Sequence, residues 1–189
     1  MAADTPASGT RFCVYSTAEL QAVLDDMARQ AQALLPPDRP VALVGILRRG
    51  QPLAAMLQSR LCALRNVPEI PLYPLKVKRY ADSLELLHAD TALEENPALA
   101  AVDLEHTTLL VVDDVLWQGH SLLRTCAWLA RVGAREVRTA VLVDRCVGRQ
   151  PVHADITGIR LQVAPNDVIE CNVPPYEDEF RVEVWRRGP

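Results

Sequence analysis

One stretch constrains the fold of this chain more than any other, residues 109–122, which read Leu-Leu-Val-Val-Asp-Asp-Val-Leu-Trp-Gln-Gly-His-Ser-Leu. Its four leading aliphatic residues predict a strand that is buried on both faces. Asp113 and Asp114 follow where we expect this strand to end, and a turn with Gly119 comes next. Ser121 then opens a run with helical spacing. The stretch therefore predicts a strand, a turn and a helix, the repeating unit of a parallel α/β sheet.

The residue types in this stretch suit a sugar phosphate. Ligands of parallel α/β sheets bind beyond the carboxyl ends of the strands, and the free amides at a helix start attract a phosphate. The carboxylates of Asp113 and Asp114 suit hydroxyl groups or a magnesium ion. We therefore expect a phosphate on the turn amides and a diol on the aspartates. The alternative interpretation is a buried strand that two acidic residues cap.

The same stretch resembles the signature with which type I phosphoribosyltransferases bind phosphoribosyl pyrophosphate (PRPP). That signature is an aliphatic strand followed by Asp-Asp, a hydrophobic pair and Thr-Gly-x-Thr. The match is good over residues 112–116 and at Gly119, whereas Gln118 and, more mildly, Ser121 each replace a threonine. The resemblance implies that Asp113 and Asp114 are catalytic and hold the ribose hydroxyls. It also implies a PRPP-binding loop made of Leu116, Trp117, Gln118, Gly119, His120 and Ser121.

A second turn should face the same crevice. Residues 41–46 predict a buried strand, and Leu47-Arg48-Arg49-Gly50 follows it, with Pro52 as the expected first helical residue. Two guanidinium groups suit a pyrophosphate, which accepts bidentate hydrogen bonds. In the family this loop binds pyrophosphate, often through an unusual peptide geometry, and we assign Arg48, Arg49 and Gly50 to that role. The alternative is a solvated basic turn.

The segment after the central motif suggests where a base would bind. Residues 137–143 predict another buried strand, which ends at Asp144 and Arg145. Together with residues 151–158 it resembles the PyrR type of the family, which combines pyrimidine-operon attenuation with uracil phosphoribosyltransferase activity; the likeness runs from about residue 16 to 171. It implies that Arg145 and the backbone of Ile156 and Thr157 read the edge of uracil. The alternative for residues 154–158 is a tight turn between strands.

These elements predict an α/β class with a twisted, mainly parallel sheet and helices on both faces. The resemblance implies a single-domain type I phosphoribosyltransferase fold with a flexible hood over residues 81–106, a segment that is long for a simple connection. Further expected elements are a helix that Ser16 and Glu19 cap, a helix that ends before Gly133, and two strands at 70–77 and 182–185. A disordered tail at 1–10 precedes the domain at 11–189.

Composition limits the partners and the compartment. The chain of 189 residues carries a net charge of −4, so it lacks the basic footprint of a nucleic-acid-binding protein, and RNA binding is doubtful. No apolar run approaches the ~18 residues of a membrane span, and the start does not resemble a signal peptide. The five dispersed cysteines indicate a reducing, cytoplasmic setting. We expect a homo-oligomer and a magnesium ion that substrate oxygens bridge, with no direct protein ligand.

The expected activity is that of a pentosyltransferase. A nucleobase, uracil in the first place, would react with PRPP to give the nucleoside monophosphate and pyrophosphate, as in pyrimidine salvage. Three alternatives stay open: an RNA-binding regulator of a pyrimidine operon, a non-catalytic relative that senses PRPP or nucleotides, and a purine phosphoribosyltransferase. Gln118 is the departure that makes the non-catalytic alternative worth testing.

Overall fold

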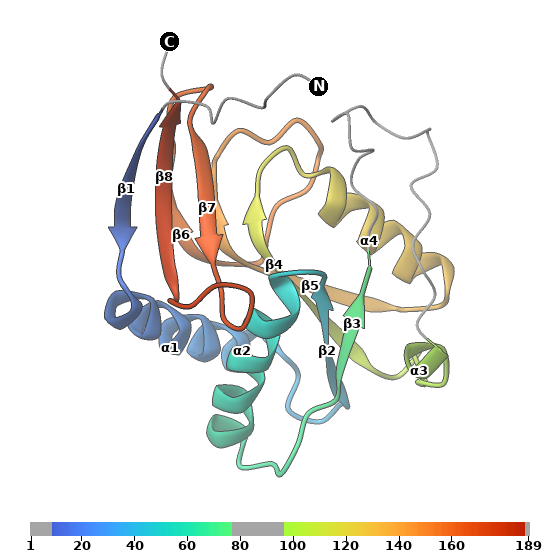
Figure 1. Ribbon diagram of the computed structural model, residues 1–189. Helices are drawn as coiled ribbons and strands as arrows, with labels where there is room; N and C mark the ends of the chain where they lie inside the picture. The colour runs from blue at the N-terminus through green and yellow to red at the C-terminus, as the bar shows by residue number, and fades with distance from the viewer. Residues whose placement is uncertain (1–8, 77–96, 188–189) are drawn as a thin grey trace, which may run out of the picture.

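A computed structural model describes residues 9–76 and 97–187 of the chain. Its centre is a five-stranded sheet in the order β3-β2-β4-β5-β6, in which every neighbouring pair runs parallel. The strands are β2 (Val41–Ile46), β3 (Leu72–Leu75), β4 (Thr108–Leu116), β5 (Glu136–Asp144) and β6 (Ile156–Arg160). The carboxyl ends of these strands lie at one edge of the sheet (Figure 1). This arrangement confirms the parallel sheet expected from the strand pattern.

Helices cover both faces of this sheet, as expected (Figure 1). The helices among the described residues are α1 (Thr17–Leu34), α2 (Gly50–Arg65), α3 (Pro97–Ala100) and α4 (His120–Arg131). Successive side chains of β4 point to opposite faces, because the side-chain period of a strand is two. Leu110 and Val112 join the core beneath α1 and α2, while Leu109 and Val111 join the core beneath α3 and α4. Burial on both faces explains why the strand reads as an unbroken aliphatic run.

A second, antiparallel sheet stands beside the first (Figure 1). It has the order β1-β8-β7 and contains β1 (Gly9–Tyr15), β7 (Val168–Asn172) and β8 (Arg181–Arg187). Of these strands the sequence predicted only part of β8. Because β1 begins at Gly9, the predicted tail at 1–10 is wrong at its last two positions, and residues 1–8 lie outside the described residues. Ile169, Val182 and Val184 of this sheet pack into the core beneath α1 and α2.

The local predictions had mixed outcomes. The backbone amide of Ser16 donates to Glu19 Oε2 at 2.8 Å, which confirms the cap of α1, and Gly133 follows α4 with a φ of 102°. Pro52 is not the first helical residue, because α2 begins at Gly50. The strand expected at 70–77 is shorter, and the turn considered for 154–158 is the start of β6. Of the predicted hood, residues 81–96 lie outside the described residues, and α3 occupies part of the rest.

Among the residues that the structure describes, no helix combines the length and the apolar character needed to cross a membrane.

Candidate active site

The two adjacent carboxylates lie inside β4 rather than at its end. β5 pairs with β4 as far as the register of Leu116 with Asp144, so the prediction that the strand stops before Asp113 is wrong. Asp113 and Asp114 are 3% and 8% exposed, so both residues are buried. Asp113 Oδ1 accepts a hydrogen bond from the Asp114 amide at 3.0 Å. The strand therefore presents a pair of buried carboxylates close to its carboxyl end.

On its other side, β4 meets a helix start instead of a strand. β2 follows β4 only as far as the register of Gly45 with Val112. Beyond that point Gly50, the first residue of α2, takes the neighbouring place. A Cβ atom on Gly50 would lie 2.6 Å from the Val112 carbonyl oxygen and 3.1 Å from Asp113 Cα. Glycine is therefore required here, and the close approach brings the predicted pyrophosphate loop against the predicted ribose carboxylates.

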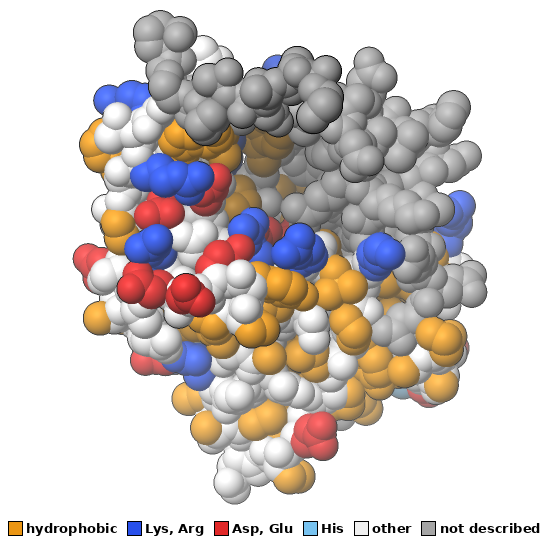
Figure 2. All heavy atoms as spheres, viewed as in Figure 1, with side chains coloured by type: hydrophobic (Ala, Val, Ile, Leu, Met, Phe, Trp, Pro, Cys, Tyr) orange, Lys and Arg blue, Asp and Glu red, His pale blue; other side chains and the backbone are white. Residues whose placement is uncertain are grey.

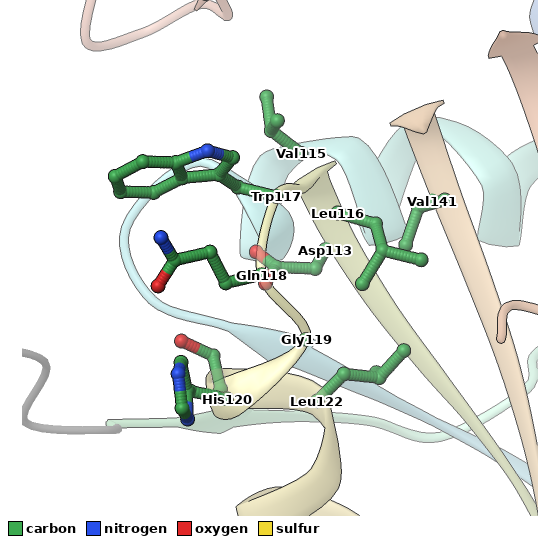
Figure 3. A pocket seen from close by; sticks show the side chains of 10 residues that line it. Asp113, Val115, Leu116, Trp117, Gln118, Gly119, His120, Leu122 and Val141 are labelled. Atoms are coloured by element: carbon green, nitrogen blue, oxygen red, sulfur yellow. The ribbon is translucent and has the colours of Figure 1, made fainter. Parts of the chain in front are cut away.

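The loop after β4 forms a small hollow at the start of α4. Gly119 has a φ of 89°, which favours glycine, and α4 begins at His120. The first amides of a helix have no intrahelical acceptor and point toward an anion. Figure 3 shows Asp113, Gln118 and His120 facing the same side of this loop. The hollow measures about 90 Å³, well below the ~300 Å³ of a site for a whole small ligand, so its size suits one phosphate group.

The β5–β6 loop, residues 145–155, holds the predicted PRPP-binding loop (residues 116–121, below called the phosphate loop) in place. The sequence did not predict this contact. The Gln118 carbonyl oxygen accepts hydrogen bonds from the amides of Arg149 and Gln150, at 3.0 and 3.1 Å. A Cβ atom on Gly119 would lie 2.7 Å from a methyl carbon of Val152. These hydrogen bonds involve only the backbone carbonyl of Gln118, so they do not depend on which side chain that residue carries.

Arg145, the predicted base-binding residue, lies under Trp117. Its amide donates to the Leu116 carbonyl oxygen at 3.0 Å, and its Nη2 donates to the Asp167 carbonyl oxygen at 3.0 Å. The guanidinium carbon is 5.6 Å from the centre of the Trp117 ring, within the range of a cation–π contact. Arg145 is 6% exposed, and this burial lowers its pKa. The exposed surface at this point is the indole of Trp117, which is 45% exposed.

The other two predicted base-binding residues, Ile156 and Thr157, do not lie at the strand ends with Arg145. Ile156 and Thr157 are the first residues of β6, and they pair with Ala140 and Val141 inside the sheet. The carboxyl end of β6 is Arg160, so the structure separates Ile156 and Thr157 from the strand ends where the other predicted residues gather. Ile156 is 1% exposed and contributes to the core beneath α1.

Both predicted pyrophosphate arginines contact the β7–β8 loop, residues 173–180. Arg49 donates to the Glu177 carboxylate from Nη2 and from Nε, whose one N–H is shared between both oxygens. Arg48 Cζ lies 4.9 Å from the centre of the Tyr176 ring. The pKa of Arg49 is raised, first by Glu177 and to a lesser degree by the charge of Asp114. Figure 2 shows basic and acidic side chains gathered over this part of the surface.

The peptide bond between Leu47 and Arg48 is cis, which agrees with the unusual geometry expected of the predicted pyrophosphate loop.

The floor of the site is a neutral thiol: Cys171 Sγ lies 3.9 Å from the Asp114 carbonyl oxygen, and burial raises the pKa of Cys171 well above its ordinary value. Negative charge near the floor therefore comes from the carboxylates rather than from sulfur.

Within residues 9–76 and 97–187, no group of three or more His, Cys, Asp or Glu side chains could hold a metal ion. The carboxylates of Asp113 and Asp114 are the groups of this site that would hold a magnesium ion or its water ligands. Their oxygen chemistry fits such an ion. The arrangement as a whole places a phosphate hollow, two carboxylates and two arginines in sequence along one edge of the sheet.

Comparisons with known proteins identify the family of the chain. The family model of the phosphoribosyl transferase domain matches residues 16–179. The chain is 31% identical to the bifunctional protein PyrR of Haemophilus ducreyi over 146 residues, which cover 75% of this chain and 78% of the relative. It is 32% identical to the bifunctional protein PyrR of Thermus aquaticus over 148 residues, with 78% and 80% covered.

Similar solved structures share the fold. A hypoxanthine phosphoribosyltransferase of Trypanosoma cruzi superimposes with a TM-score of 0.72 at 17% identity, covering 98% of this chain and 95% of that one. A hypoxanthine phosphoribosyltransferase of Staphylococcus aureus gives a TM-score of 0.68 at 15% identity, with 83% and 80% covered. With the fold, the signature loop and the family model in agreement, the chain belongs to the type I phosphoribosyltransferase family.

Proposed function

We propose that the protein transfers the phosphoribosyl group of PRPP to a nucleobase, with uracil as the first candidate. The observation that supports this proposal is the contact of Gly50 with β4, which sets the loop of Arg48 and Arg49 against the strand that carries Asp113 and Asp114. A substrate with a 5′-phosphate, a ribose diol and a pyrophosphate carries the matching groups in the matching order. PRPP is such a substrate.

Each step of the reaction has a group to support it. A ring nitrogen of the base attacks the anomeric carbon, the bond from that carbon to pyrophosphate breaks, and the N–H proton of the base is released. The ribosyl group becomes cationic as the bond breaks, so the fixed charges of Asp113 and Asp114 stabilise it. The amides at His120 and Ser121 hold the 5′-phosphate and fix its distance from the base. Arg48 and Arg49 receive the pyrophosphate as it leaves.

A magnesium ion, when bound with PRPP, would supply positive charge to the leaving pyrophosphate. Asp113 and Asp114 are the residues of this chain that would contact such an ion or its water ligands. The proposed stabilisation of the cationic ribosyl group by these two carboxylates does not depend on the ion, since β4 holds both residues buried in place.

The base is the least constrained part of the proposal. The likeness to PyrR-type proteins supports uracil, and the solved hypoxanthine phosphoribosyltransferases support a purine only at the level of the fold. Trp117 offers an exposed aromatic face beside the carboxylates, which suits stacking with either kind of base. We therefore place uracil first and a purine base second.

A regulator of a pyrimidine operon is the second candidate, and the relatives named bifunctional protein PyrR favour it. RNA binding depends on clustered Lys and Arg side chains that neutralise phosphates. The chain has a net charge of −4, so we place this role below the enzyme. Sequence-dependent, nanomolar binding of a pyrimidine-operon leader RNA at physiological salt would reverse that order.

A panel of bases incubated with PRPP and magnesium tests the reaction and the base together. We expect pyrophosphate release with uracil and the appearance of uridine monophosphate by chromatography. Hypoxanthine, guanine and adenine serve as the comparison set. Turnover with a purine and none with uracil would contradict the assignment of the base and leave the reaction class standing.

Replacing the two carboxylates by amides tests their role. Asp113→Asn and Asp114→Asn should each lower kcat about a hundredfold, which is typical of the loss of one group that stabilises developing charge. The fold should survive, because the side-chain amide oxygen introduced by Asp113→Asn can still accept the bond from the Asp114 amide. Thermal unfolding measures the fold and steady-state kinetics measure the loss. The matched control is Asp38→Asn, an exposed aspartate that precedes β2 at the other end of the sheet. Near-normal turnover in a variant that combines Asp113→Asn with Asp114→Asn would rule out the proposed role.

Gln118 tests whether the departure from the family signature matters. A threonine hydroxyl is compact, whereas the glutamine amide must order a longer stem to reach the same phosphate. We expect Gln118→Thr to tighten PRPP by several-fold, since one neutral hydrogen bond contributes about 1 kcal/mol. Calorimetric titration of PRPP with magnesium measures the difference, and Gln118→Ala shows what loss of the amide alone does.

Two outcomes would change the interpretation of this loop. If the natural protein binds no PRPP at millimolar concentration while Gln118→Thr does, the chain is a non-catalytic relative. If the threonine weakens binding, the glutamine amide is itself an adapted contact with the phosphate.

A further inference from the structure

The two arginines of the pyrophosphate loop are held by two consecutive residues from a distant part of the chain. Arg49 Nε donates to both oxygens of the Glu177 carboxylate, at 3.1 and 3.3 Å, and Nη2 also donates to Oε1. The guanidinium of Arg48 lies over the ring of Tyr176. Figure 1 shows the β7–β8 loop, which carries both residues, beside the start of α2. One loop thus contacts both cations of the proposed pyrophosphate site.

The β7–β8 loop is itself fixed to the rest of the protein. Glu177 Oε2 accepts a hydrogen bond from the Val173 amide at 2.8 Å, and the Tyr176 amide donates to the Val173 carbonyl oxygen at 3.1 Å. Val173 is fully buried, and Thr17 Oγ1 at the start of α1 donates to the Phe180 carbonyl oxygen at 2.8 Å. A carboxylate anchored in this way is built to orient a partner rather than to move aside for a ligand.

The contact with Glu177 leaves part of the guanidinium for a ligand. A guanidinium has five N–H groups in a fixed plane, and Glu177 takes the edge formed by Nε and Nη2. The Nη1 group lies outside that edge and can donate to a phosphate oxygen. Without Glu177, the Arg49 side chain would have to lose its rotamer freedom when the pyrophosphate binds.

We propose that Glu177 and Tyr176 are positioning residues for the pyrophosphate site: Glu177 orients Arg49, Tyr176 orients Arg48, and neither touches the substrate. This inference rests on the proposed function, because it assigns these two residues to the site that receives the leaving group. It adds a long-range element, the β7–β8 loop, to a site otherwise built from β2, α2, β4 and α4.

The test compares ligands that do and do not carry a pyrophosphate. Inorganic pyrophosphate and ribose 5-phosphate, each with magnesium, are titrated calorimetrically against the natural protein, Glu177→Gln and the matched control Asp178→Asn, an exposed acid of the same loop. Glu177→Gln should weaken pyrophosphate binding about tenfold, the effect of one charge-assisted hydrogen bond, and leave ribose 5-phosphate unchanged. Asp178→Asn should change neither.

Tyr176 gives a second, independent readout. Tyr176→Phe keeps the ring under Arg48 and should preserve pyrophosphate binding, whereas Tyr176→Ala should weaken it. In steady-state kinetics, Glu177→Gln and Tyr176→Ala should raise the KM for PRPP more than they lower kcat. A role confined to stability would instead lower the unfolding temperature and affect both ligands alike.

Three results would overturn the inference, and they are distinguishable. Tighter pyrophosphate binding by Glu177→Gln would show that the carboxylate competes with the ligand. Equal weakening of pyrophosphate and ribose 5-phosphate would show a general structural defect. Failure of the natural protein to bind pyrophosphate, ribose 5-phosphate or PRPP would remove the proposed function, and the inference with it.

Discussion

The close contact between the start of α2 and β4 is the constraint on which the site depends. The pairing of β2 with β4 ends at Gly45, β4 continues to Leu116, and Gly50 fills the step between them. Because the start of α2 lies directly against the strand that carries Asp113, no Cβ fits at Gly50. The unequal lengths of two neighbouring strands, rather than a cleft between domains, thus bring cations and carboxylates together.

This arrangement places charge where folding alone would not favour it. Burying a carboxylate costs free energy unless hydrogen bonds or opposite charges compensate for it. Asp113 accepts a bond from the next amide, and Asp114 lies within electrostatic range of Arg49. Arg49 also donates to Glu177, so a third carboxylate shares the charge of the same guanidinium. In the proposed reaction these carboxylates would face a cationic transition state, and charges fixed in this way assist a reaction without reorganising.

The sequence predicted the parts of this protein that depend on local pattern. The aliphatic run of β4, the turn at Gly119 and the cap of α1 are set by neighbours a few residues away, and all three are present. The antiparallel sheet was missed because β1 and β8 pair from opposite ends of the chain. The turn considered for residues 154–158 was wrong for a related reason, since Ile156 and Thr157 pair with β5, and a short run between turn residues does not show this pairing. The ion pair of Arg49 with Glu177 joins residues 128 positions apart, and no periodicity reports such a contact.

The two halves of the proposed site therefore differ in how they tolerate change. The phosphate half comes from one continuous segment, and its donors are backbone amides that a second loop holds through the Gln118 carbonyl oxygen. A side chain there can change without removing those donors, which explains how the segment accommodates a glutamine. The pyrophosphate half uses side chains instead, and Arg49 keeps its orientation through a loop that arrives from the far end of the chain. Substitutions in the β7–β8 loop can therefore reach the chemistry of the site although no signature motif includes that loop.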